Sequence, residues 1–384
     1  MSDRIYVTKP FLPPLEEFLP YVEEIWRNGA LTNGGPLHQR LELALAEYLG
    51  VEHLALFNNG TNALITALQA LDLQGEVITT PFSFVATTNA LIWNKNTPVF
   101  VDIDPVTLNL DPARIEAAIT PRTSAILGVH CYGNPCQMEE IRAIADRHGL
   151  HVVYDAAHAF GVHNEQGSVL ARGDLSTLSL HATKVFNTFE GGAIICRDAA
   201  MKQHINELKN FGIVDETTIK VPGSNGKMSE IQAAMGLAQL PHIDACIARR
   251  GEIDAAYRSA LAEIPGLDPL PKLYQTKSNF AYFPLLVNED YPLDRDGIYE
   301  FLRGQDIMTR RYFYPLLSNL PMYAGLPSAD PARLPVANSV AARIMCLPIF
   351  PDMTDADLER VITALRLPLQ QSRHWQRGLE KLNA

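Results

Sequence analysis

One stretch of this chain combines a single lysine with apolar residues and glycines: Ser179-Leu-His-Ala-Thr-Lys184-Val-Phe-Asn-Thr-Phe-Glu190-Gly-Gly192. Its lysine stands in an apolar, glycine-rich setting, whereas a surface loop is normally rich in charge. A second stretch, Val152-Val-Tyr-Asp155-Ala-Ala-His158, places an aspartate after an apolar run, 29 residues before Lys184. We interpret Asp155 as the end of a buried strand, where a carboxylate needs a cationic partner.

Together, Lys184 and Asp155 predict a particular chemistry. A lysine can hold an aldehyde as an imine, and a carboxylate can keep a pyridine nitrogen protonated as an electron sink. This combination predicts pyridoxal 5'-phosphate as the cofactor. Taken singly, Lys184 is also compatible with a solvated loop lysine, and Asp155 with a structural cap of the following helix.

Alternating apolar runs and helical patterns predict the fold class. Short β-branched runs are interspersed with helical periodicity, which is typical of βα units that build a mainly parallel sheet covered by helices. The expected strands are 54–57, 76–79, 98–101, 125–129, 151–154, 177–180 and 193–196, and the expected helices are 62–71, 84–93, 112–119 and 138–148.

A change in the sequence pattern after Pro265 predicts a second domain. Two helices, 229–247 and 248–264, are expected to lead into it, followed by a strand at 280–287 and helices at 294–305 and 355–365. We therefore expect a large domain at 25–250 and a smaller α/β domain at 251–384. The N-terminal segment 1–24 is a candidate to join the small domain.

Several polar and aromatic residues are expected near this lysine. Gly60-Thr61-Asn62 follows a strand and opens a helix, where free N–H groups and the helix dipole favour a phosphate, although for Gly-Thr taken alone a simple helix cap is the commoner role of Thr61. Ser179 ends another strand and adds a hydroxyl at the same sheet edge. Phe84 is a candidate to stack on a planar ring, and His158 to hydrogen-bond the cofactor, with core packing as the alternative for both.

Composition limits the other partners. A formal net charge of −11 argues against a nucleic-acid binder. The five cysteines form no CxxC pair, which predicts reduced thiols and a cytoplasmic protein. No apolar stretch approaches the ~18 residues that span a bilayer, so no membrane association is expected, and no metal site is predicted.

Collinear motifs along nearly the whole chain resemble the sugar aminotransferases of the DegT/DnrJ/EryC1/StrS group, which are fold-type I pyridoxal phosphate enzymes. The motifs are 31-LTNGGP-36, 60-GTNAL-64, 130-HCYGNP-135, 155-DAAHAFG-161, the stretch from Ser179 to Gly192, 228-MSEIQAA-234 and 347-LPIFP-351.

The resemblance implies a role for individual residues. Lys184 becomes the Schiff-base lysine, Asp155 the pyridinium partner, His158 a neighbour of the cofactor ring and Phe84 its stacking partner. Thr61, Asn62 and Ser179 match the phosphate site, beside Gly60. Asn225 matches an asparagine that relatives extend into a neighbouring subunit, which implies a homodimer with shared active sites.

The same resemblance implies the reaction. The motifs fit best an aminotransferase that uses glutamate and converts dTDP-4-keto-6-deoxyglucose to dTDP-4-amino-4,6-dideoxyglucose, a sugar of the kind used in O-antigen and lipopolysaccharide. Lys227 and Tyr314 are candidate contacts to the nucleotide-linked sugar. Relatives often have an arginine where Lys227 stands and a histidine where Leu317 stands, so the substrate contacts differ here.

Three alternatives stay open from the sequence. Amination at C3 of a dTDP-3-keto-6-deoxyhexose would use the same lysine. A dehydratase of the same family would have histidine at position 184, so Lys184 argues for amino transfer. A non-catalytic regulatory protein with this fold would not need Lys184, Asp155 and Ser179 together.

Overall fold

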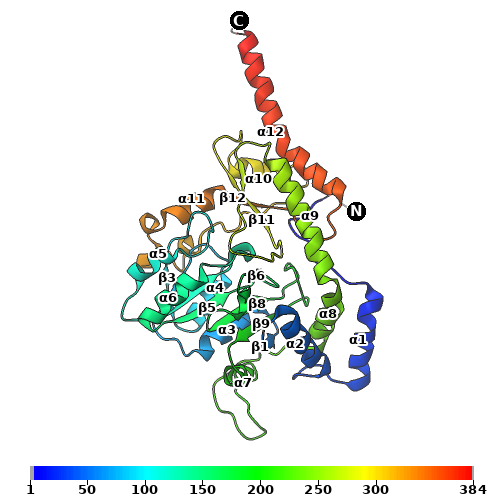
Figure 1. Cartoon of the computed structure of the whole chain (residues 1–384), viewed down its shortest axis with the longest axis vertical. Helices are drawn as coiled ribbons and strands as arrows, with labels where there is room; N and C mark the ends of the chain where they lie inside the picture. The colour runs from blue at the N-terminus through cyan, green and yellow to red at the C-terminus, as the bar shows by residue number, and fades with distance from the viewer. Residues whose placement is uncertain (1–3, 383–384) are drawn as a thin grey trace.

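The computed structural model describes residues 4–382, and a seven-stranded sheet forms the centre of its large domain (Figure 1). Its strand order is β1-β9-β8-β5-β4-β2-β3. The strands are β1 (His53–Phe57), β2 (Glu76–Thr79), β3 (Thr97–Phe100), β4 (Thr123–Val129), β5 (His151–Asp155), β8 (Leu175–Ser179) and β9 (Gly192–Cys196). Strand β9 runs antiparallel to both of its neighbours, and the other pairings are parallel. The expected mainly parallel sheet is therefore confirmed.

Helices cover both faces of this sheet because its strands are apolar on both sides. In β1, Leu54 and Leu56 join one buried core, whereas Ala55 and Phe57 join the other. The first core takes side chains from α2 (Pro36–Leu49), α6 (Met138–His148) and α8 (Glu230–Gln239). The second takes them from α3 (Gly60–Ala70), α4 (Ala86–Trp93) and α7 (Ala199–Leu208).

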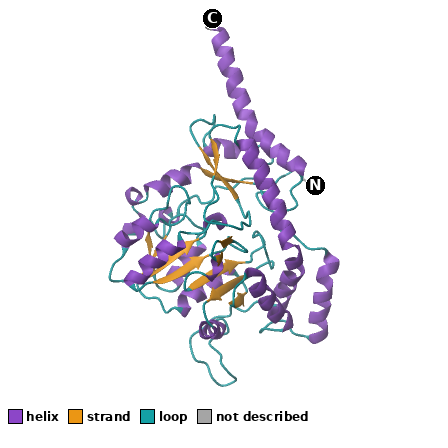
Figure 2. Cartoon of the chain, viewed as in Figure 1, coloured by secondary structure: helices purple, strands orange, loops and turns teal. Residues whose placement is uncertain are grey.

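A three-stranded antiparallel sheet builds the smaller domain, separate from the large sheet (Figure 2). It contains β10 (Leu267–Pro269), β11 (Phe283–Val287) and β12 (Ile344–Leu347). Buried side chains of β11 and β12 pack with those of α9 (Ile243–Leu261), α10 (Arg295–Arg303) and α12 (Asp355–Leu382). The chain also contains α5 (Pro112–Ile115), α11 (Pro335–Arg343) and the two-stranded ribbon of β6 (His163–Asn164) and β7 (Gly167–Ser168).

Helix α9 corrects one sequence-based expectation. The predicted break between residues 247 and 248 is wrong, because α9 runs unbroken through that point. The break lies earlier, where α8 ends and a 3-10 turn spans Leu240–His242. Pro241 explains the position, since proline has no N–H to continue the helical hydrogen bonds. The proposed domain boundary at residue 250 thus falls inside a continuous helix.

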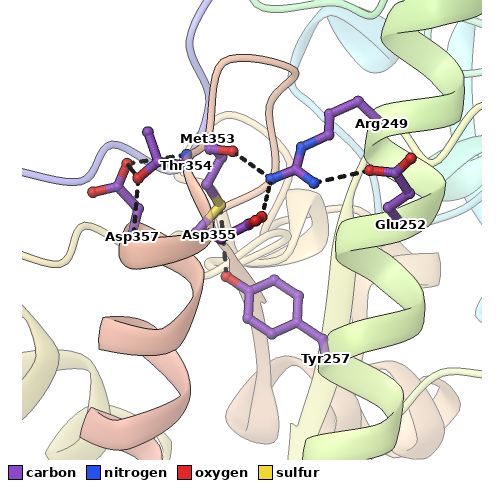
Figure 3. A network of polar contacts seen from close by, with 7 residues as sticks. All are labelled: Arg249, Glu252, Tyr257, Met353, Thr354, Asp355 and Asp357. Carbon is purple, nitrogen blue, oxygen red and sulfur yellow. Dashed lines mark hydrogen bonds and ion pairs between the residues drawn. The ribbon is translucent and has the colours of Figure 1, made fainter.

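A polar network fixes α9 to the start of α12 (Figure 3). Arg249 donates hydrogen bonds to Glu252 at 2.8 Å, to the carbonyl of Met353 at 2.9 Å and to Asp355 at 2.6 Å. Thr354 and Asp357 bond to each other at the beginning of α12, in the manner of a helix cap. Arg249 therefore attaches the long connecting helix to the small domain, and Ile253, Tyr257 and Leu261 from its C-terminal half lie in the core of that domain.

The N-terminal segment contacts both cores. Ile5 packs in the core of the small domain, and its N–H donates to the carbonyl of Asp306 at 2.9 Å. Helix α1 (Leu15–Asn28) then packs along α8, and Ile25 enters a core of the large domain. Within residues 4–382 no helix combines the length and apolar character that crossing a membrane requires.

Candidate active site

A cavity of about 610 Å³ lies where the carboxyl ends of β5 and β8 meet the beginning of α3. Parallel α/β sheets commonly bind ligands at this edge. Residues of the small domain, Tyr282 and Arg310 together with Tyr312 and Phe313, form the remaining wall. The cavity includes eight of the sequence-predicted site residues: Gly60, Thr61, Asn62, Phe84, Asp155, His158, Ser179 and Lys184.

One end of the cavity is built for an anion. The side chain of Asn59 accepts a hydrogen bond from the N–H of Asn62 at 2.8 Å and so caps α3, which leaves Thr61 exposed at the helix N-terminus. Gly60 lies against Ser179: a Cβ on Gly60 would sit 2.8 Å from the Cβ and 3.0 Å from the Cα of Ser179. Only glycine allows the helix N-terminus and the Ser179 hydroxyl to approach a phosphate together.

Asp155 lies at the end of β5 with only 8% of its surface exposed. The Thr87 hydroxyl donates to one carboxylate oxygen at 2.8 Å, and the N–H of Ala157 donates to the other at 3.2 Å. Burial raises the pKa of Asp155, while these hydrogen bonds and the Lys184 ammonium oppose that rise. A cation placed beside this carboxylate would be strongly stabilised in such a poorly solvated position.

Lys184 follows β8 in a tight turn, in which its N–H donates to the carbonyl of His181 at 2.8 Å. Its ammonium lies 6.0 Å from the centre of the Tyr282 ring. Burial lowers the pKa of Lys184 to about 8, and Asp155 acts in the opposite direction. At that pKa about a tenth of the lysine is neutral at pH 7, so a nucleophilic amine is readily available.

His158 is held in one tautomer. The N–H of Tyr132 donates to its Nδ1 at 3.2 Å, so the ring proton is on Nε2. The ring of Phe313 stacks parallel to it, with centroids 6.1 Å apart. Burial, followed by Lys184, lowers the pKa of His158 well below its usual value, which keeps the imidazole neutral. His158 is therefore a neutral hydrogen-bond donor in the cavity.

Not every predicted residue lies in the cavity of its own chain. Phe84 lines it with 56% of its surface exposed, as a stacking surface requires. Tyr314 is outside, with the Arg295 guanidinium 4.6 Å from its ring centre. Asn225 and Lys227 are also outside, on the loop that follows α7 and extends from the large domain (Figure 1).

Some residues of the site have no signal in the sequence. Thr87 lies inside α4, where nothing marks it as the partner of Asp155. Arg310 and the neighbouring aromatic pair, Tyr312 and Phe313, come from a segment more than 120 residues beyond Lys184. Only the packing of the small domain brings them to the cavity. Within the run Tyr312-Phe-Tyr314 the sequence predicts a substrate contact at Tyr314, whereas Tyr312 and Phe313 are the residues that line the cavity.

The donor set fits pyridoxal phosphate. Gly60 and Ser179 form a close cradle at a helix N-terminus, suited to a phosphate. Asp155 is a buried carboxylate in need of a cation, suited to a pyridinium nitrogen. Lys184 is an amine of lowered pKa in the same cavity, suited to the aldehyde.

Comparisons with known proteins support the same conclusion. The chain is 54% identical over 366 residues to the dTDP-4-amino-4,6-dideoxy-D-glucose transaminase of Shigella dysenteriae, covering 95% of this chain and 99% of that one. A crystal structure of DesI with its TDP-sugar product matches with a TM-score of 0.92 and 37% identity, covering 99% and 96% of the two chains. The NtdA structure from Bacillus subtilis with bound PMP matches with a TM-score of 0.84 and 28% identity, covering 96% and 87%.

The profile of the DegT/DnrJ/EryC1/StrS aminotransferase family matches residues 15–366. The expected fold-type I architecture, pyridoxal phosphate cofactor and aminotransferase activity are thereby confirmed. This chain belongs to the DegT/DnrJ/EryC1/StrS aminotransferase family and is a pyridoxal phosphate-dependent sugar aminotransferase.

Proposed function

We propose that this protein transfers an amino group from glutamate to C4 of dTDP-4-keto-6-deoxyglucose, forming dTDP-4-amino-4,6-dideoxyglucose. The observation that carries the proposal is the 54% identity, over nearly the full length of both chains, to a transaminase named for that product. The cavity supports it, because it contains an amine, a buried carboxylate and an anion cradle in one place.

The side chains of this protein have distinct tasks in the reaction. Pyridoxal phosphate, when bound, supplies the aldehyde that holds the substrate nitrogen and a ring that withdraws electrons. Lys184 accepts and returns a proton at Nζ, which its pKa of about 8 allows near neutral pH. Asp155 keeps a proton on the ring nitrogen, and Thr87 orients that carboxylate. The beginning of α3 and Ser179 hold the phosphate.

A direct experiment tests the substrate. The protein loaded with cofactor is incubated with glutamate and, in separate reactions, with the dTDP-4-keto- and dTDP-3-keto-6-deoxy sugars. NMR then identifies the aminated carbon, and the Lys184→Ala variant serves as the inactive control. We expect nitrogen at C4; amination at C3 alone would refute the proposed substrate while leaving the cofactor chemistry intact.

We also propose a homodimer with shared active sites, in which Asn225 and Lys227 serve the neighbouring subunit. Asn225 is exposed and lies outside the cavity of its own chain. The same loop exposes apolar side chains, Phe211, Ile213, Val214 and Ile219, which a second subunit would cover. In this assembly Tyr314 and Lys227 are the proposed contacts to the nucleotide-linked sugar.

The five cysteines are all free and buried, which supports our placement of the protein in the reducing cytoplasm, where it would supply lipopolysaccharide synthesis.

Mixed dimers test the sharing. Lys184→Ala and Asn225→Ala subunits are each inactive or impaired when pure, and they are unfolded and refolded together. If Asn225 serves its neighbour, the mixed dimer contains one site with both residues intact, and activity returns. If both residues serve the same chain, every site keeps one defect and mixing restores nothing.

A further inference from the structure

Arg310 is the feature of the active-site cavity that the proposed chemistry has not used. It lines the cavity together with two carboxylates, those of Asp155 and Glu190, and one ammonium, that of Lys184. Asp155 accepts hydrogen bonds from the Thr87 hydroxyl and the N–H of Ala157, and the Glu190 carboxylate lies 3.5 Å from Nε2 of His181. Within residues 4–370, the guanidinium of Arg310 makes no hydrogen bond or ion pair. The cavity therefore presents one arginine with all its donors free.

The position of Arg310 is nevertheless well defined. Its N–H donates to the carbonyl of Cys346 at 3.2 Å, and its own carbonyl accepts from the N–H of Cys346 at 2.7 Å. This pairing attaches the residue to strand β12 of the small domain. The guanidinium lies 5.6 Å from the ring centre of Tyr312, another residue of the cavity wall. A backbone paired with β12 thus presents a charged side chain to the cavity.

The neighbouring arginines differ from Arg310. Arg311 donates to Asp296 at 2.8 Å, and Arg295 donates to the same carboxylate at 2.7 Å. Their charges are compensated within the protein, and neither lines the cavity. A fixed cation without a protein partner at a substrate cavity is suited to an anion that arrives with the substrate.

We infer that Arg310 binds an oxyanion of a substrate, a role that rests on the proposed function. Two substrates carry such a group: the amino donor has a carboxylate, and the nucleotide sugar has a diphosphate. The planar fork of a guanidinium matches the paired oxygens of either group, whereas an ammonium offers only a point charge. The shared chemistry assigns Arg310 as a substrate-binding residue, and the source of the anion is decided by the test.

Two unreactive probes distinguish the sources. Glutarate has the carbon chain and carboxylates of the donor but no amino group, and dTDP has the diphosphate but no sugar. Dissociation constants are measured by calorimetry on the cofactor-loaded wild type, on Arg310→Gln and on Arg310→Lys. Arg303→Gln is the matched control, because Arg303 is exposed outside the cavity and pairs only weakly with Glu300 at 3.7 Å.

The expected result is a weakening of one probe by about tenfold to a hundredfold in Arg310→Gln, the usual loss for hydrogen bonds to a charged group. Arg310→Lys should lose less, and Arg303→Gln should bind as the wild type does. Weaker glutarate binding identifies the donor carboxylate, and weaker dTDP binding identifies the diphosphate. Unchanged binding of both probes in both Arg310 variants would overturn the inference about Arg310 and leave the proposed function standing. A wild type that binds neither probe would overturn the proposed function as well.

Discussion

Replacing Gly60 with alanine tests the contact on which the phosphate cradle depends. The new Cβ would lie 2.8 Å from the Cβ of Ser179 and 3.0 Å from its Cα. Carbon atoms pack at about 3.5–4.0 Å, so α3 and the end of β8 must separate by roughly 0.7 Å. Overpacking of this kind costs about 1–3 kcal/mol of folding free energy.

The same shift weakens cofactor binding. A hydrogen bond of about 2.9 Å from the helix N-terminus to a phosphate oxygen would stretch beyond ~3.5 Å and be lost. Each lost hydrogen bond to a charged group costs about 1.5–3 kcal/mol, which corresponds to about a tenfold to hundredfold rise in the dissociation constant for pyridoxal phosphate. Titration of the cofactor-free protein, followed by visible absorbance, measures this constant.

Gly325→Ala provides the control for the same chemical change. A Cβ on Gly325 would meet no atom within 4 Å, so this variant should bind the cofactor and unfold as the wild type does. Urea unfolding of both variants separates loss of stability from loss of affinity. If Gly60→Ala bound pyridoxal phosphate within twofold of the wild type, the close approach of Gly60 and Ser179 would not be what forms the cradle.

Further predictions concern the polar centre of the site. Lys184→Ala should retain the cofactor and lose turnover, whereas Asp155→Ala should lose both activity and cofactor affinity, as absorbance titrations and rate assays will show. Thr87→Val removes the 2.8 Å hydrogen bond to Asp155, which should raise the pKa of that carboxyl further and lower kcat by about tenfold. Thr88→Val is the control, and an unchanged kcat in Thr87→Val would contradict the role given to Thr87. In cofactor-free protein burial lowers the pKa of Lys184 to about 8 from its ordinary value of 10.5. Between these two pH values the unfolded state binds more protons than the folded state, so the contribution of Lys184 to stability rises with pH there. Lys184→Met should therefore be more stable than the wild type at pH 7, by a margin that shrinks towards pH 10 in urea unfolding; a margin that does not change with pH would show that the lysine is not desolvated.

The architecture of the large domain was accessible from local pattern. Its strands are apolar on both faces, and glycines and short helical stretches separate them, so each of the seven expected runs corresponds to a strand of the sheet within a few residues. The ends of two apolar runs also placed Asp155 and Ser179 correctly at the ends of strands, at one edge of the sheet. Helices were harder: α1, α2, α7 and α11 were not predicted, and the break between α8 and α9 was misplaced although Pro241 marks it.

The sequence by itself determined the reactive groups, because imine formation, a buried carboxylate and a helix N-terminus each require a residue type that local context makes recognisable. Lys184, Asp155 and Gly60 could be identified in this way. The tertiary structure alone decided the partners of those groups. Thr87 on α4 donates to Asp155 at the end of β5, 68 residues further along the chain, and Arg310 lines the cavity because its backbone pairs with β12 of the small domain. Such contacts join residues far apart in the chain, and neither periodicity nor a local motif records them. Only tertiary packing, within the large domain for Thr87 and between the two domains for Arg310, sets the distances on which hydrogen bonding and charge depend.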